Sequence, residues 1–183
     1  AATISIFYSL IISVFVYRTI KIRDLPKILL EGVHSYAPIL IILSAAVAFA
    51  RVITLMNVAS IVSEVVLSAI SSKVVILLLI NVLLLFVGMI MDTGPAILVF
   101  TPVLLPVVKA LGVDPIHFGI IMCVNLAIGF VTPPMGANLF VASNLSKVSV
   151  IDIAKKAVPF ILAFLVALLM ITFIPEISLF LVK

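Results

Sequence analysis

The sequence lacks tryptophan, has one cysteine and carries few charges. The single cysteine, Cys123, excludes a disulfide bond within the chain. Charged residues make up 10% of the chain and hydrophobic residues 66%, and the mean hydropathy is +1.54. A soluble domain is about half apolar and about a quarter charged. The composition therefore excludes an ordinary soluble domain and predicts an all-α integral membrane protein, in which phenylalanine and tyrosine would supply any interfacial aromatic belt.

Apolar segments recur along the whole sequence, so a cleavable signal peptide does not account for them. Residue 1 is not methionine and already lies in an apolar stretch. We therefore expect the chain to be part of a longer protein, most simply its second half.

The net charge of +4 is unevenly distributed along the sequence. Basic clusters in short loops mark the cytoplasmic side of a membrane protein, and these clusters do not indicate nucleic-acid binding. If the 74–110 segment returns to the side from which it enters, seven basic residues lie on one side of the membrane and three on the other. The larger set is Arg18, Lys21, Arg23, Lys27, Lys147, Lys155 and Lys156, and the smaller set is Lys73, Lys109 and Lys183. This count predicts that the larger set is cytoplasmic and that the C-terminus is on the outer side.

The apolar pattern divides the chain into expected elements. Residues 1–17 form a first span, 18–34 are polar and basic, and 35–56 are long enough to cross the membrane again. Residues 57–72 alternate apolar and small polar side chains, which predicts an amphipathic helix lying at the membrane interface. A last span is expected at 157–181.

Two long apolar runs are each interrupted by proline and glycine. As single helices, 74–110 and 116–146 would measure about 55 Å and about 46 Å, whereas the hydrocarbon core is about 30 Å thick. Irregular backbone at membrane depth occurs only where it is buried in protein or lines a cavity, and an ionisable residue beside it indicates a functional site. Asp92 is such a residue.

The interruptions define two expected motifs. The first run predicts a helical hairpin with arms 74–90 and 96–110 and its tip at Asp92-Thr93-Gly94. The second predicts a broken span made of 116–130 and 137–146.

The interrupted segments offer oxygen ligands for a small hard cation such as sodium. Asp92 has a carboxylate, and Thr93 and Thr132 have hydroxyls. Proline has no N–H, so Pro133 and Pro134 are expected to leave the carbonyls four residues earlier without helical partners. These carbonyls would add further oxygen ligands.

The same residues are expected to begin helices. Asp92 or Thr93 is a suitable N-cap with Pro95 just inside the helix, and Thr132 followed by Pro133 has the same pattern. Two helix N-termini would then meet near the middle of the membrane, as in secondary transporters, and their partial positive charge favours an anionic ligand.

Other roles for these residues stay open at this point. Prolines in membrane helices often produce kinks without binding anything, and Asp92 could instead pair with a cation from another segment. Asn125 either joins two helices or contacts a ligand. Arg51 either extends its side chain toward the membrane surface or binds a substrate carboxylate.

Two other functions compete with transport. Asp92-Thr93-Gly94 matches the active-site triplet of aspartic proteases, but that chemistry needs two carboxylates that share a proton. Asp114 and Asp152 fall at or beyond the ends of the expected spans. An ion channel pore would need a continuous path and usually repeats its filter by oligomerisation. We therefore expect a transporter and not an enzyme.

Four segments in this order resemble the large membrane subunit of tripartite ATP-independent periplasmic (TRAP) transporters. They are Gly88-Met89-Ile90-Met91-Asp92, Thr101-Pro102-Val103-Leu104-Leu105-Pro106, Gly112-Val113-Asp114-Pro115-Ile116-His117-Phe118-Gly119 and Thr132-Pro133-Pro134-Met135-Gly136. The resemblance is clearest over residues 45–146. The whole sequence looks more similar to sialic-acid members than to dicarboxylate members.

The resemblance implies a sodium-driven elevator transporter of the ion-transporter superfamily, built from inverted repeats of which this chain is the second. It implies scaffold spans and an arm helix at 1–72, a transport-domain part at 73–146 (a re-entrant hairpin at 73–110 and a broken helix at 115–146) and a last transmembrane helix at 147–183. The implied partners are the N-terminal half of the same subunit, a small membrane subunit, separate or fused, and a periplasmic binding protein that delivers an organic anion. The implied location is the bacterial inner membrane, with the C-terminus in the periplasm.

The resemblance also implies roles for individual residues. Asp92 and Thr132 would bind sodium through their side chains, and Met135 through its backbone carbonyl. Gly94 and Gly136 would allow the backbone to approach the ion closely. The candidates for substrate contacts are Arg51, Asn125, Pro133 and Pro134.

Overall fold

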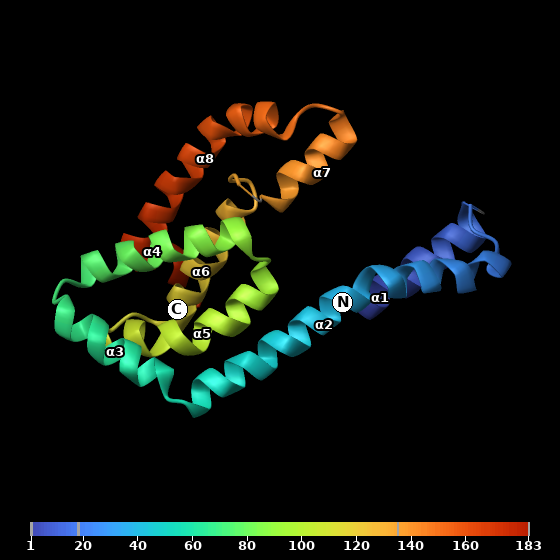
Figure 1. The fold of residues 1–183 in the computed structure, drawn as a ribbon. Coiled ribbons are helices and arrows are strands. Elements are labelled where there is room, and N and C mark those ends of the chain that lie inside the picture. Colours follow the sequence, from blue (N-terminus) through green and yellow to red (C-terminus); the bar gives the residue numbers. More distant parts are fainter. Residues whose placement is uncertain (1, 18, 135, 183) are drawn as a thin grey trace. The chain divides into compact units, whose positions relative to one another are not determined.

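The computed structural model describes residues 2–17, 19–134 and 136–182, and every regular element in these residues is a helix (Figure 1). Four helical segments of the described chain are long and apolar enough to cross a membrane. They are Ile22–Leu55, which contains α2 (Leu25–Leu55), α4 (Lys73–Ile90), α5 (Thr93–Ala110) and α8 (Val150–Phe173). The expectation of an all-α chain is confirmed, and the helix lengths agree with an integral membrane protein.

The chain divides into two compact units, residues 1–44 and 45–183. The first unit contains α1 (Ala2–Ile11), a π-helical turn η1 (Ile12–Val16), a short 3-10 turn η2 (Ile22–Asp24) and the start of α2. Helix α2 begins at Leu25 and therefore starts before the apolar segment 35–56 that was expected to cross the membrane. A helix needs apolar side chains only where it lies inside the bilayer, and α2 therefore extends through polar sequence.

The second unit holds the hairpin and the broken helix. Its helices after α2 are α3 (Val58–Ala69), α4, α5, α6 (Pro115–Gly129), α7 (Ala137–Ser146), α8 and α9 (Pro175–Leu179). Helix α6 packs against both hairpin arms, α4 and α5, while α3 packs along α5 (Figure 1). Helix α8 packs against α6 and α7, and α9 returns to α6. The broken helix therefore has the hairpin on one side and α8 on another.

Helix α4 shows why the hairpin packs as it does. Its buried apolar side chains recur every three or four residues, which puts them on one face; they are Ile76, Leu77, Ile80, Leu84 and Val87. Phe118, Met122 and Leu126 of α6 belong to the same buried cluster. The opposite face of α4, including Leu79, Val82 and Phe86, is apolar but exposed. Apolar side chains on both faces are typical of a helix that meets lipid or another membrane helix.

The last long helix has other bounds than expected. Helix α8 runs from Val150 to Phe173, so it starts before the expected span of 157–181, and that span is wrong at its C-terminal end, where the helix breaks before α9. Its start is fixed by Ser149, whose hydroxyl accepts a hydrogen bond from the Asp152 N–H at 3.2 Å and donates one to the Asp152 carboxylate at 2.6 Å. Its end precedes Pro175, which has no N–H to continue the helix and begins α9.

Candidate functional site

Two glycines bring the hairpin tip to the break in the second helix. Gly88 lies near the end of α4 and Gly129 is the last residue of α6. A methyl carbon added to Gly129 would lie 2.2 Å from the carbonyl carbon of Gly88, and one added to Gly88 would lie 3.0 Å from the Leu126 Cα. The backbones of α4 and α6 are therefore in direct contact, and the segments that follow both helices start from the same place.

A cavity of 310 Å³ lies where these segments meet. The hairpin contributes Gly88, Met89, Ile90, Met91 and Asp92 to its lining, and the broken helix contributes Phe130 and Asn138. Among the described residues that line it, Asp92 alone is charged. The structure thus places the hairpin tip and both halves of the broken helix around one cavity.

The hairpin tip has the expected local structure. Asp92 is the N-cap of α5, and its carboxylate accepts a hydrogen bond from the Thr93 N–H at 2.7 Å. The carboxylate is exposed, whereas the hydroxyl oxygen of Thr93 is buried and has no hydrogen-bond partner among the described residues. Gly94 is exposed in the first turn of α5. The tip thus has one anionic group and one buried hydroxyl without a partner.

The second break differs from expectation, because Thr132 does not begin a helix. Helix α7 begins at Ala137 with Gly136 as its N-cap. The Thr132 hydroxyl instead donates a hydrogen bond to the Ile128 carbonyl at 2.7 Å, within the end of α6. The predicted helix start at Thr132-Pro133 is wrong because a residue that precedes proline is disfavoured in helical conformation, and both Thr132 and Pro133 precede one.

The carbonyls expected to be free at this break have partners. The Gly129 carbonyl accepts a hydrogen bond from the Thr132 N–H at 3.0 Å, and the Phe130 carbonyl accepts one from the Asn138 N–H at 3.2 Å. The loop folds back tightly, since a methyl carbon added to Gly136 would lie 2.8 Å from the Phe130 oxygen and 2.9 Å from the Thr132 oxygen. Gly136 therefore permits a close approach of backbone to these two carbonyls, and only a residue without a side chain fits there.

The remaining candidates lie in different places. Pro133 and Pro134 are exposed in the loop, and Met135 lies outside the described residues. Arg51 is exposed on α2 and is not among the residues that line the 310 Å³ cavity. Asn138, which lines it, was missed from the sequence. Its signal was a polar side chain two residues after Gly136, the glycine that ends a proline break in an apolar run.

Asn125 lies deeper in the unit and joins helices. Its side chain is 0% exposed, and its amide donates hydrogen bonds to the Asn81 side-chain oxygen at 2.9 Å and to the Ile121 carbonyl at 2.8 Å. Asn81 in turn donates to the Thr172 hydroxyl at 3.0 Å. A line of buried side chains thus connects α6, α4 and α8, which is one of the two roles that the sequence left open for Asn125.

The Asn81–Asn125 pair gives a stability prediction. Replacing each residue by leucine, singly and together, is expected to give a coupling free energy of about 0.5–1 kcal/mol, the value typical of hydrogen bonds between membrane helices. The measurement is thermal or denaturant unfolding of the complete permease in detergent. Strictly additive effects would show that the two side chains do not stabilise the packing of α4 on α6.

The sequence model described as "Tripartite ATP-independent periplasmic transporter, DctM component" matches residues 1–177. The chain belongs to this family. The DctM component is a transporter permease, which agrees with the expectation of a transporter and not an enzyme.

Relatives in the DctM family carry different substrate names. The chain is 42% identical to the isethionate TRAP transporter permease protein DctMQ of Oleidesulfovibrio alaskensis, over 98% of the chain and 28% of that protein. It is 36% identical to the C4-dicarboxylate large permease protein DctM of Rhodobacter capsulatus, over 98% of the chain and 41% of that protein. It is 30% identical to the sialic acid large permease protein SiaM of Vibrio cholerae, over 99% of the chain and 42% of that protein.

These matches bear on two expectations. The chain spans less than half the length of each of these DctM-family relatives, as expected for part of a longer protein. The expected closer likeness to sialic-acid members is not supported, because the identity to the C4-dicarboxylate protein is higher than that to the sialic acid protein.

Proposed function

We propose that this chain is the C-terminal part of the large membrane subunit of a TRAP transporter, and that it couples sodium entry to the import of an organic anion. The observation that carries the proposal is the cavity lined by Asp92 of the hairpin tip together with Phe130 and Asn138 of the broken helix. The family match supports the same function. The family match does not favour an ion channel pore or an intramembrane protease.

The residues at the hairpin tip fit a sodium ion. Sodium is a hard cation that takes oxygen ligands, and Asp92 offers a carboxylate beside the cavity. The buried Thr93 hydroxyl has no partner among the described residues, so its oxygen is available to a cation. The Thr132 hydroxyl donates its hydrogen to Ile128, which leaves its oxygen lone pairs free to bind the same ion. We propose Asp92, Thr93, Thr132 and the Met135 carbonyl as ligands.

The substrate is proposed to be a small organic anion. The names of the relatives specify isethionate, C4-dicarboxylates and sialic acid, all of which carry a negative charge. Helix α7 begins at Ala137 without a side-chain cap on Gly136, so the partial positive charge at its N-terminus favours an anion nearby. Arg51, Pro133 and Pro134 remain the proposed substrate contacts, whereas the buried Asn125 would act only by holding α6 against α4.

The assembly around this chain is also a proposal. The N-terminal half of the same subunit would supply the first of two inverted repeats, so that the hairpin α4–α5 is re-entrant and moves in an elevator fashion. A small membrane subunit and a periplasmic binding protein would complete the transporter in the bacterial inner membrane. The relative named DctMQ supports a small subunit that can be fused to the large one. The distribution of basic residues along the sequence supports a periplasmic C-terminus in this proposal.

Thr93 provides the test of the sodium assignment. In proteoliposomes containing the complete transporter and its binding protein, uptake of the anion is expected to require an inward sodium gradient. Thr93→Val removes the hydroxyl but keeps the shape, and the loss of this oxygen ligand is expected to raise the sodium concentration for half-maximal uptake about tenfold, equivalent to about 1.4 kcal/mol of binding free energy. Thr93→Ser should retain wild-type sodium dependence.

The two variants also separate a structural role from ligation. If the Thr93 hydroxyl only fills space, Thr93→Val should leave the sodium dependence unchanged and raise the unfolding temperature, because it removes a buried polar group without a partner. That result would remove Thr93 from the site. Uptake that does not depend on sodium in the wild type would refute the coupling itself.

A further inference from the structure

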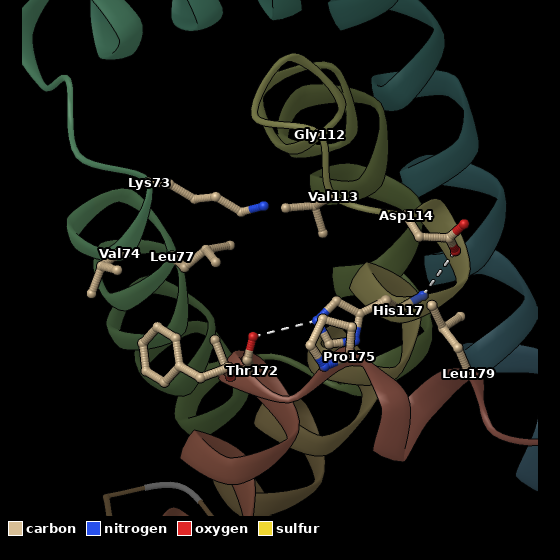
Figure 2. A pocket seen from close by; sticks show the side chains of 11 residues that line it. Lys73, Val74, Leu77, Gly112, Val113, Asp114, His117, Thr172, Pro175 and Leu179 are labelled. Carbon is tan, nitrogen blue, oxygen red and sulfur yellow. Dashed lines mark hydrogen bonds between the residues drawn. The ribbon is translucent and has the colours of Figure 1, made fainter.

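A second cavity lies at the end of the hairpin remote from Asp92. It has a volume of 280 Å³ and is formed by the start of α4, the loop before α6, and the break between α8 and α9. Figure 2 shows Lys73 extending over it, with His117 and Thr172 on the opposite wall. The proposed sodium and substrate sites do not use this cavity.

The helix ends place this cavity at a membrane surface. Helices α4, α5 and α8 are each long and apolar enough to cross the bilayer. Lys73 is the first residue of α4, and Phe173 is the last residue of α8. Both residues line the cavity, and each is the end of a long apolar helix, so the cavity lies at the membrane surface whether the hairpin crosses the bilayer or returns to its own side.

The cavity contains a positive charge that the described residues do not neutralise. Lys73 forms no ion pair with any described residue, and Ser72 makes no capping hydrogen bond at the start of α4. The Asp114 carboxylate also lines the cavity, but it caps α6 and forms no ion pair with Lys73; it accepts hydrogen bonds from the N–H groups of Ile116 at 2.8 Å and His117 at 3.3 Å. An anion beside Lys73 would therefore not have to displace a salt bridge to another described residue.

The opposite wall is held in place by His117. This imidazole is 3% exposed; its Nδ1 lies 3.0 Å from the Ser178 hydroxyl and its Nε2 lies 3.4 Å from the Thr172 carbonyl oxygen. These contacts connect the start of α6 to the end of α8 and to α9. Hydrogen bonds between three helices, α6, α8 and α9, therefore hold this wall of the cavity in place.

The rest of the lining is apolar. Val74 and Leu77 of α4 face the cavity from one side, and Phe173 and Leu179 from the other. A lysine at the membrane surface above apolar walls matches the two parts of a phospholipid, an anionic headgroup and an acyl chain. We propose that this cavity binds an anionic phospholipid, with the phosphate on Lys73 and one acyl chain along Val74 and Leu77.

The test compares two lipids on the complete, delipidated permease by native mass spectrometry. Phosphatidylglycerol and phosphatidylcholine with the same acyl chains are added, and the wild type is expected to bind the anionic lipid about fivefold more tightly, the factor that one lysine near an anionic surface provides. Lys73→Gln should lose this preference and Lys73→Arg should keep it. Lys109→Gln is the matched control, because Lys109 is exposed in the last turn of α5 and does not line the cavity.

Several results would overturn the proposal. One is equal binding of both lipids by the wild type, as expected if the N-terminal half of the subunit fills the cavity. Another is an equal loss of the preference for the anionic lipid in Lys73→Gln and Lys109→Gln, which would indicate diffuse surface charge. Binding of the soluble headgroup glycerophosphoglycerol as tightly as the intact lipid would show that the apolar walls bind no acyl chain. Sodium-dependent uptake is a separate measurement, so failure here leaves the proposed function untouched.

Discussion

Replacing Asp92 by asparagine is expected to abolish sodium coupling in the complete transporter while leaving the protein folded. Asparagine is as good an N-cap as aspartate, so the hydrogen bond from the Thr93 N–H and the start of α5 should survive. The change removes one negative charge beside the cavity. A unit charge about 4 Å from a cation contributes about 4 kcal/mol at an effective dielectric constant of about 20, so sodium affinity should fall by about a hundredfold or more.

The measurement is sodium-driven uptake in proteoliposomes, with the sodium concentration varied at constant ionic strength. Asp114→Asn is the matched control, because Asp114 is also a helix N-cap that asparagine can replace, and it does not line the cavity at the hairpin tip. We expect Asp114→Asn to keep the sodium dependence of the wild type. If Asp92→Asn transports with unchanged sodium dependence, Asp92 is not a sodium ligand.

Replacing Gly129 by alanine is expected to lower both stability and transport strongly. The new methyl carbon would lie 2.2 Å from the Gly88 carbonyl carbon and 2.5 Å from the Gly88 Cα. Both are backbone atoms, so a change of side-chain rotamer cannot relieve the clash. Helices α4 and α6 would have to separate, which disturbs the packing of the hairpin on the broken helix. We expect a loss of about 3 kcal/mol, at the upper end of the usual range for overpacking, together with loss of uptake.

The control for this prediction lies on the same helix. A methyl carbon added to Gly119 meets no heavy atom within 4 Å, so Gly119→Ala should keep or raise the unfolding temperature, since alanine favours helix over glycine by up to about 1 kcal/mol. Unfolding temperatures in detergent and sodium-dependent uptake are measured for both variants. Wild-type values for Gly129→Ala would show that the two backbones are not in contact in the working transporter.

Much of the hairpin could be predicted from the sequence because its signals are local. Asp92 and Pro95 stand within one turn of the start of α5, and the arm boundaries fall within a few residues of those expected. The run 116–146 gave the correct break for a similar reason, since consecutive prolines cannot be accommodated inside a helix. Local signals failed where two interpretations fit the same residues. Thr132 was expected to cap the start of the next helix, but its hydroxyl bonds the Ile128 carbonyl at the end of α6.

By itself, the sequence determined that this protein belongs in a membrane, that it is helical, and that two of its apolar runs break. These properties depend on composition and on residues a few positions apart. Only the tertiary structure decided which groups meet: Asn125 bonds Asn81 at a separation of 44 residues, and Asn81 bonds Thr172 at 91. The Gly88–Gly129 contact that brings the two breaks to one cavity also joins distant residues. Such pairings arise from the packing of whole helix faces. Many apolar residues together determine that packing, so it cannot be predicted from a short motif.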